Sequence, residues 1–148
     1  MANLDQQVAA LVAREAIRDL PRRYCDCVWR DDIDGIVDLF TVDGSFVAEM
    51  GGKTYTFKGR EELRRMFASG LGIQPRPYIH NHVVELNGES FASGRCYLDL
   101  HSARNNMEFM GAGYYTDEYM ATPQGWKFLS RHFVAVRMDD VPQGLDGA

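Results

Sequence analysis

Helical spacing of apolar residues dominates the first part of the chain. Apolar side chains recur at intervals of three and four residues from Leu4 to about Arg18, and the alanines among them favour a helix. Pro21 should kink or restart this helix because it lacks an amide donor, although the apolar stripe continues to Val28. We therefore expect a helical region that packs one face inward and directs Tyr24 toward the interior.

Two shorter helices and a hairpin are predicted to follow. The acidic pair Asp31-Asp32 precedes the second helix, and Asp32 has the position of a helix cap. Gly51-Gly52 marks the turn of the hairpin, and Gly59 opens the third helix, which has acidic residues in its first turn. The expected ranges are 33–40 for the short helix, 45–50 and 53–57 for the strands, and 59–69 for the third helix.

A longer hairpin over 78–101 carries three of the four histidines. Its turn is Asn87-Gly88, the strongest short-range hairpin signal. Alternation places His80 and His82 on one face of the first strand. A loop with an even number of residues would add Arg95, Tyr97 and Asp99 to that face, whereas an odd loop would add Cys96, Leu98 and Leu100. The first arrangement is a polar network and the second is an apolar pocket.

Two more strands are expected over 107–121 and 126–136, with Gly111 and Gly113 marking a bulge or close packing. The tail over 138–148 contains proline and glycine and should be loosely held. Helices grouped near the beginning, followed by long strands, indicate a single α+β domain over 1–148. We expect a strongly curved sheet that wraps around the N-terminal helices and encloses a pocket.

Charge and composition narrow the partners. Sixteen basic and twenty-one acidic residues give a net charge of −5 without any basic run, which disfavours binding to nucleic acid or an anionic membrane. We expect a small apolar ligand. The start of the chain lacks the pattern of a signal peptide, and no apolar stretch spans a bilayer, so a cytoplasmic protein is expected. The odd number of cysteines predicts free thiols.

Several segments in order resemble a known family. They are the run Ala16-Ile17-Arg18-Asp19-Leu20 before Tyr24, the segment over 32–44, Tyr55 followed by Gly59-Arg60-Glu61, and Tyr115-Thr116-Asp117-Glu118-Tyr119 with Gly125-Trp126-Lys127-Phe128. Together they resemble the SnoaL-like, scytalone dehydratase-like branch of the nuclear-transport-factor-like superfamily. The resemblance covers nearly the whole chain and is specific for the fold more than for the function.

The resemblance implies a cone-shaped α+β barrel with an internal pocket, usually dimeric through the outer sheet. Catalytic members mostly remove or move a proton without a cofactor, so none is expected here. In dehydratase-like members a strand histidine pairs with an aspartate from the helix. Alignment of the strands places His80 at that histidine and Trp29 at that aspartate, and the superfamily relation favours the odd loop with Cys96, Leu98 and Leu100 beside His80.

Two hypotheses for the function follow. The first is a cofactor-independent lyase or isomerase, in which His80 acts as acid or base, Tyr24 polarises the substrate oxygen and Asp31 orients the imidazole. The second is a small-molecule-binding or dimerisation module without chemistry, suggested by Trp29. A metal site at His80, His82, Asp99 and His101 is the weaker reading of those residues, because a hydrogen-bonded cluster needs no metal. The residues expected to contact substrate are Trp29, His82, Tyr55, Phe57, Met66, Cys96, Leu98, Met110 and Tyr114.

Overall fold

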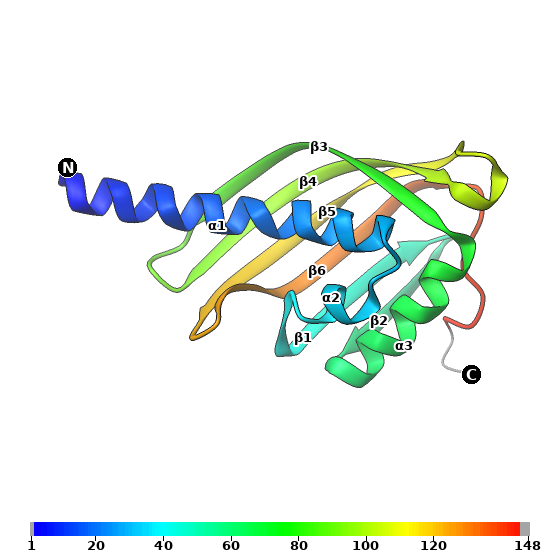
Figure 1. The fold of residues 1–148 in the computed structure, drawn as a ribbon, viewed down its shortest axis with the longest axis horizontal. Helices are drawn as coiled ribbons and strands as arrows, with labels where there is room; N and C mark the ends of the chain where they lie inside the picture. The colour runs from blue at the N-terminus through cyan, green and yellow to red at the C-terminus, as the bar shows by residue number, and fades with distance from the viewer. Residues whose placement is uncertain (1, 146–148) are drawn as a thin grey trace.

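A strongly curved sheet wraps along one long helix and is closed at one end by shorter helices (Figure 1). The computed structural model describes residues 2–145. The helices are α1 (Leu4–Trp29), α2 (Ile33–Val37) and α3 (Arg60–Gly70), with 3-10 turns at Leu71–Ile73 and Ala103–Asn105. The strands are β1 (Phe40–Met50), β2 (Lys53–Lys58), β3 (Pro75–Leu86), β4 (Phe91–Ser102), β5 (Glu108–Thr122) and β6 (Gly125–Met138). The predicted α+β class is confirmed.

The first helix is longer and more regular than its sequence predicts. It begins at a capping box, in which the Asn3 side chain and the Gln6 side chain each accept from the other residue's backbone N–H. It then continues through Pro21, which is buried and does not end the helix. The buried residues of α1 lie in its second half, and its N-terminal turns project past the β3–β4 turn (Figure 1).

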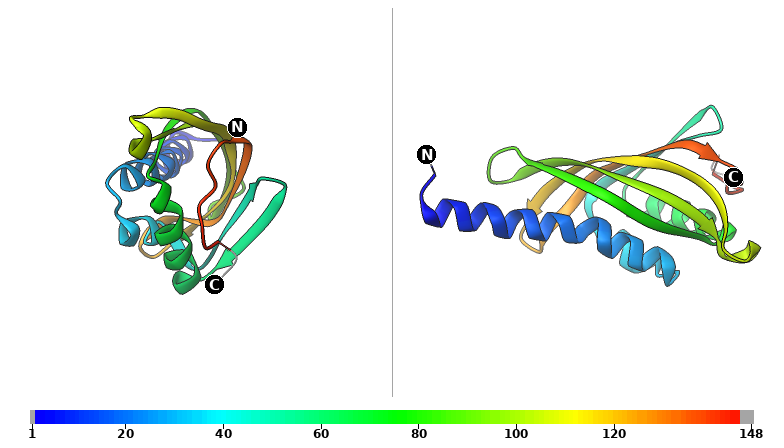
Figure 2. Two further views of the ribbon diagram at one scale, coloured as in Figure 1. Left: turned by 90° about the vertical axis from the view of Figure 1, so that its right-hand side faces the viewer. Right: turned by 90° about the horizontal axis from the view of Figure 1, so that it is seen from above.

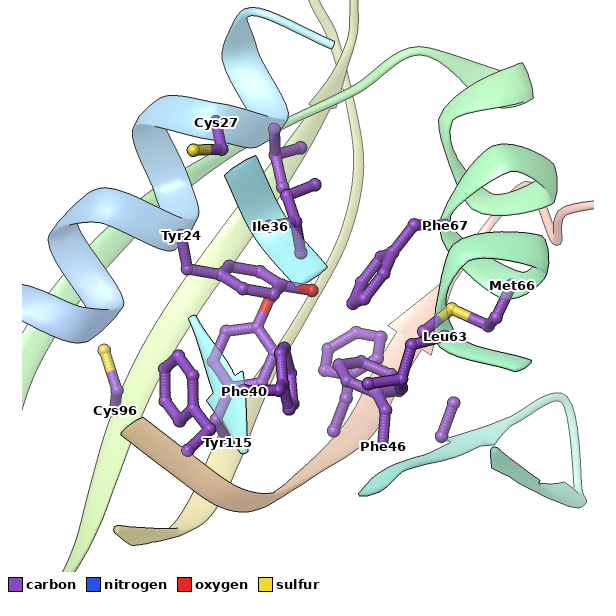
Figure 3. Packing of buried hydrophobic residues seen from close by; sticks show 14 of the residues in the cluster. Tyr24, Cys27, Ile36, Phe40, Phe46, Leu63, Met66, Phe67, Cys96 and Tyr115 are labelled. Atoms are coloured by element: carbon purple, nitrogen blue, oxygen red, sulfur yellow. The ribbon is translucent and has the colours of Figure 1, made fainter. Parts of the chain in front are cut away.

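The six strands are ordered β2-β1-β6-β5-β4-β3. All neighbours are antiparallel except β1 and β6, which are parallel, so the sheet is mixed. Its concave face and the helices bury one continuous apolar core, which includes Ile17, Ile36, Leu63 and Phe128. Side chains of α3 and of the end of α1 meet in this core. Tyr24 of α1 and Phe67 of α3 lie edge to face there, with ring centroids 5.8 Å apart (Figure 3).

A bulge in β3 decides the faces of the central hairpin. Near its turn, Leu86 pairs with Ala92 and His82 pairs with Cys96, so the loop is odd. The register shifts between His80 and His82, where Asn81 has a φ of 21°, and His80 therefore pairs with Tyr97. Between the bulge and the turn, the predicted odd-loop arrangement is correct, because His82 lies opposite Cys96. On the other side of the bulge the even-loop arrangement is correct, because His80 lies opposite Tyr97.

Two glycines in β5 allow close strand packing, as predicted. A Cβ atom at Gly113 would lie 2.0 Å from the Val134 carbonyl oxygen, and one at Gly111 would lie 2.5 Å from that of Arg137. The register between β5 and β6 also shifts at Gly113. Glycine is therefore required at both positions by the approach of the neighbouring backbone.

The segment after β6 is packed instead of loosely held. Pro142 and Leu145 are buried, and Val141 packs partly against the core. The prediction of a loose tail is wrong for residues 139–145, because apolar side chains in this segment find a surface to cover. The remainder of that prediction, residues 146–148, lies outside the described residues.

The structure bears on the predicted absence of a membrane-spanning helix but not on the predicted dimer. Within residues 2–145, no helix is both long and apolar enough to span a membrane. The homodimer and the cytoplasmic location stay predictions.

Candidate functional site

An almost entirely apolar cavity of about 90 Å³ lies between the curved sheet, the end of α1 and α3. The wall includes Tyr24 and Val28 from α1, Met66 and Phe67 from α3, and Tyr115 from β5. Its other residues are Phe46, Ala48, Met50, Phe57, Gly70, Leu71, Ile73, Pro75, Pro77, Leu100, Phe133, Met138, Pro142 and Leu145. Among the described residues that form this wall, none is a carboxylate, an imidazole or a basic side chain. The wall is therefore suited to an apolar ligand.

Two phenols are the polar features of the wall. Tyr24 and Tyr115 are both buried, and their rings meet edge to face with centroids 5.7 Å apart. Burial raises the pKa of each phenol well above its ordinary value, although the positive charge of Arg131 acts in the opposite direction. Both hydroxyls therefore stay protonated and can donate a hydrogen bond to an oxygen atom of a ligand.

A fully buried ion pair lies behind these phenols. Asp117 on β5 and Arg131 on β6 are register partners, and Arg131 Nε donates to Asp117 Oδ1 at 3.0 Å. Both side chains are 0 % exposed. Burial is the largest effect and lowers the pKa of Arg131, but Asp117 together with Tyr115, Tyr24 and Tyr119 offsets it, so the pKa of the guanidinium is raised overall. Asp117 accepts hydrogen bonds at both oxygens, the second from Tyr119, so it is held as a carboxylate.

Three aromatic rings surround the guanidinium of Arg131. Its Cζ atom lies 3.4 Å from the Tyr115 ring centroid, 4.3 Å from that of Tyr24 and 4.7 Å from that of Phe128. Within the described part of the chain, its two terminal nitrogens have no hydrogen-bond partner. Their positive charge is stabilised by the electron-rich faces of the rings. The cation thus polarises the two phenols that face the cavity.

A hydrogen-bonded chain connects this ion pair to the edge strand β3. The Tyr119 hydroxyl donates to Asp117 Oδ2 at 2.9 Å, and His82 Nε2 lies 2.9 Å from the same hydroxyl oxygen. Since Tyr119 uses its proton toward Asp117, His82 must donate from Nε2 and keep Nδ1 as its free acceptor. Gly94 makes room for this contact, because a Cβ atom there would lie 2.9 Å from the Tyr119 oxygen.

His82 is neutral in this chain. Burial lowers its pKa to about 4, and the positive charges of Arg131, Arg18 and Arg22 act in the same direction. A neutral imidazole agrees with the single N–H that the contact with Tyr119 uses. His82 faces inward as predicted, but it lies outside the cavity wall.

The prediction that His80 faces the pocket is wrong. Its side chain is 59 % exposed on the outer face of the sheet and is hydrogen-bonded to Asp99. The extra residue at Asn81 causes this, because one inserted residue turns every earlier side chain of the strand to the other face. The alternation that joined His80 to His82 therefore does not hold.

Asp99 is shared by two histidines on the outer face. His101 Nε2 lies 2.7 Å from Asp99 Oδ2, and His101 Nδ1 lies 3.0 Å from the Met107 carbonyl oxygen. Because both acceptors require a proton from the ring, His101 is an imidazolium here. The bond to the Met107 carbonyl raises its pKa, and Asp99 adds to this effect. Among the described residues, no cluster of three or more His, Cys, Asp or Glu side chains could hold a metal ion.

Asp31 and Trp29 fasten the end of α1 instead of forming the site. Asp31 pairs with Arg76, with Oδ2 and Nη2 3.2 Å apart, so the prediction that it orients His80 is wrong. The Trp29 indole N–H donates to the Pro77 carbonyl at 2.7 Å. This bond fastens the end of α1 to β3. Trp29 lies outside the cavity wall. Asp32 caps α2 as predicted, since its side chain accepts from the Gly35 N–H at 2.9 Å.

The remaining predicted contact residues divide into three groups. Phe57 and Met66 line the cavity together with Tyr24, whose role toward a substrate stays a prediction. Tyr114 lies on the outer face beside Tyr97, with centroids 6.2 Å apart. The others pack in or against the core without reaching the cavity wall, and they are Tyr55, Cys96, Leu98 and Met110.

Sequence reasoning missed the buried ion pair, although a signal was present. In the segment over 115–119, alternation places Tyr115, Asp117 and Tyr119 on one face. An acid between two aromatic residues on a buried face requires a cation or donors nearby. Arg131 on the next strand is the partner that this requirement predicts, but its register could not be read from the sequence.

The fold and the cavity define a class of α+β proteins in which a curved sheet encloses an apolar pocket. The profile of the SnoaL-like domain family matches residues 9–132, so the chain belongs to this family. No curated protein matches the chain.

Solved structures support the same fold. An NTF2-like protein with a cystatin-like fold from Novosphingobium aromaticivorans has a TM-score of 0.76 at 20% identity, covering 98% of this chain and 97% of its own. The hexachlorocyclohexane dehydrochlorinase LinA-type3 from Novosphingobium barchaimii has a TM-score of 0.76 at 19% identity, covering 92% and 93%. A scytalone dehydratase-like protein from N. aromaticivorans has a TM-score of 0.75 at 16% identity, covering 91% of each chain.

Removal of one member of the buried ion pair should strongly destabilise the fold. Asp117→Asn leaves the guanidinium of Arg131 without its counter-charge, so the free energy of unfolding should fall by about 3–5 kcal/mol. Urea denaturation followed by circular dichroism measures this. Asp34→Asn, which breaks an exposed pair with Arg64, is the control and should cost at most about 1 kcal/mol. Equal effects of the two variants would contradict the assigned role of the pair.

The titration of His82 should report its burial. Its pKa of about 4 lies below the value of 6.5 for an unfolded histidine. Between pH 4 and pH 6.5 the unfolded chain therefore binds more protons at this residue than the folded chain does. The free energy of unfolding should therefore fall by about 2–3 kcal/mol from pH 6.5 to pH 4 on account of this group, and His82→Gln should remove this contribution. Heteronuclear NMR titration measures the pKa directly. In the same spectra His101 should titrate above its ordinary value, and a His82 pKa at or above 6.5 would contradict the assignment.

Proposed function

We propose that the chain binds a small, largely apolar molecule through a hydroxyl or carbonyl oxygen. The observation that carries this proposal is an apolar cavity wall in which Tyr24 and Tyr115 are the hydrogen-bond donors. An apolar body would gain free energy by leaving water, while its oxygen would accept from the phenols and so avoid an unsatisfied polar group. The wall offers no countercharge, so a charged ligand would lose its hydration without compensation.

The polarity of the cavity suggests a hydroxylated aromatic compound as the first probe. 2-Naphthol is neutral at about pH 7 and fluoresces, whereas naphthalene has the same rings without the oxygen. The protein should bind 2-naphthol more tightly. Tyr24→Phe and Tyr115→Phe should each reduce the 2-naphthol affinity about fivefold, the equivalent of one neutral hydrogen bond, and leave that for naphthalene unchanged. Fluorescence titration measures both affinities.

Tyr78→Phe is the matched control for these variants. Tyr78 lies outside the cavity, packed against Trp29 with ring centroids 5.5 Å apart. Its loss of a hydroxyl should change neither affinity. Equal binding of 2-naphthol and naphthalene to the wild-type protein would contradict the role of the phenols, and binding of neither would contradict the proposal.

A cofactor-independent lyase or isomerase is the second candidate function. The observation that favours it is the caged guanidinium of Arg131 behind the two phenols. Donors backed by a buried cation would stabilise negative charge as it develops on a substrate oxygen, as in an enolate. The structural relatives named as a dehydrochlorinase and as scytalone dehydratase-like agree with such chemistry. Because the described wall carries no carboxylate, imidazole or amine that could accept the proton from carbon, this proton would pass to water.

Hydrogen exchange at carbon tests this second candidate without knowledge of the natural substrate. In deuterated water, 2-tetralone should exchange its α-hydrogens faster in the presence of the protein, because stabilisation of the enolate lowers the barrier. Tyr115→Phe should reduce the acceleration at least about tenfold. Proton NMR measures the exchange. His80→Gln changes only the outer face of the sheet and should leave the exchange rate unchanged. The mechanism would be contradicted if this variant lost the acceleration, or if the wild-type protein showed none.

A further inference from the structure

Residues 139–145 form a strap across the open end of the curved sheet. Figure 2 shows this red segment leaving β6 and crossing the end of the barrel toward α3. Two of its side chains, Pro142 and Leu145, belong to the wall of the cavity, and Leu145 is 7 % exposed. Part of the cavity wall is thus built by a segment outside the sheet and the helices.

The strap is held at three places by different kinds of contact. At its start, the Asp139 N–H donates to the Met110 carbonyl at 2.8 Å. At the next residue, Asp140 forms an ion pair with Arg104 of the β4–β5 turn. Near its end, the Leu145 side chain is buried in the apolar core.

We propose that this strap is a latched cover that controls access to the cavity and limits the length of its ligand. The proposal rests on the function proposed above, because it concerns the same cavity. The Arg104–Asp140 pair is the latch, since among the described residues it is the ion pair that joins the strap to an element other than β6. Release of the latch frees Pro142 and Leu145 to leave the wall together.

The strength of the latch suits an opening motion. The side chains of Arg104 and Asp140 are 44% and 31% exposed, so water competes with their attraction. A partly exposed pair of this kind contributes little stability compared with the packing of β-strands. The strap can therefore open without disturbing the sheet. Its apolar side chains return it to the closed position because they are exposed to water when it is open.

Leu145 is the residue of the strap that determines ligand length. It contributes to the cavity wall from the strap, whereas Tyr24 and Tyr115 provide the hydrogen-bond donors from α1 and β5. A ligand held by its oxygen at these phenols and extending outward would meet Leu145. A smaller side chain at this position should favour a longer ligand.

Stopped-flow fluorescence with 2-naphthol tests the latch in the full chain. Arg104→Ala should increase both the association and the dissociation rate constants about threefold to fivefold, the effect of losing a partly exposed ion pair, with a smaller change in affinity. Arg137→Ala is the matched control, since Arg137 lies in β6 and pairs with Asp139 where the strap leaves that strand, so the pair does not join the strap to the β4–β5 turn. It should leave both rate constants unchanged.

The longer hydroxylated compound 2-anthrol tests the limit on length. Leu145→Ala should raise the ratio of 2-anthrol to 2-naphthol affinity at least about threefold, because removal of a buried leucine side chain enlarges the outer end of the cavity. Normal 2-naphthol binding with unchanged rates in Arg104→Ala would overturn the latch, and an unchanged ratio in Leu145→Ala would overturn the limit on length. Both results would leave the proposed function intact. Failure of the wild-type protein to bind either compound would overturn the two proposals together.

Discussion

The burial of the Asp117–Arg131 ion pair is the constraint on which the interior depends. A charge pair without exposure loses its hydration, and the structure compensates with a hydrogen bond from Tyr119 and with three aromatic faces around the guanidinium. Two of those faces, Tyr24 and Tyr115, also line the cavity. The same rings therefore stabilise a cation on one side and face an apolar space on the other, which links the stability of the fold to the polarity of the site.

The bulge at Asn81 separates the histidines of the central hairpin by function. On the inner side, His82 is neutral and joins the buried network through Tyr119. On the outer side, His80 and His101 share Asp99, and His101 is an imidazolium with a proton on each ring nitrogen. One inserted residue thus divides a group that alternation alone would place together, and the two environments shift the pKa values of His82 and His101 in opposite directions.

Much of the fold was predictable from the sequence, because its elements follow from local periodicity and turn residues. The long strands, the close packing at Gly113 and the cap at Asp32 were predictable in this way. The continuation of α1 through Pro21 was not, since tertiary packing overrides a local helix-breaking tendency. The site was less accessible, because it depends on register. Neither the bulge at Asn81 nor the pairing of Asp117 with Arg131 is determined by a local pattern.

The position of charge is the reason why we propose an oxygen-bearing apolar ligand for this interior and not an ionic one. The guanidinium lies behind aromatic rings, so it polarises the Tyr24 and Tyr115 hydroxyls without offering a direct ion pair to a ligand. A neutral oxygen gains from polarised donors and loses little hydration, whereas an anion would lose its hydration and find no cation in the wall. Trp29 has the same consequence, because its indole donates to the Pro77 carbonyl outside the cavity wall and adds no charge to the cavity. Selection by this cavity therefore follows from what surrounds its wall as much as from the wall itself.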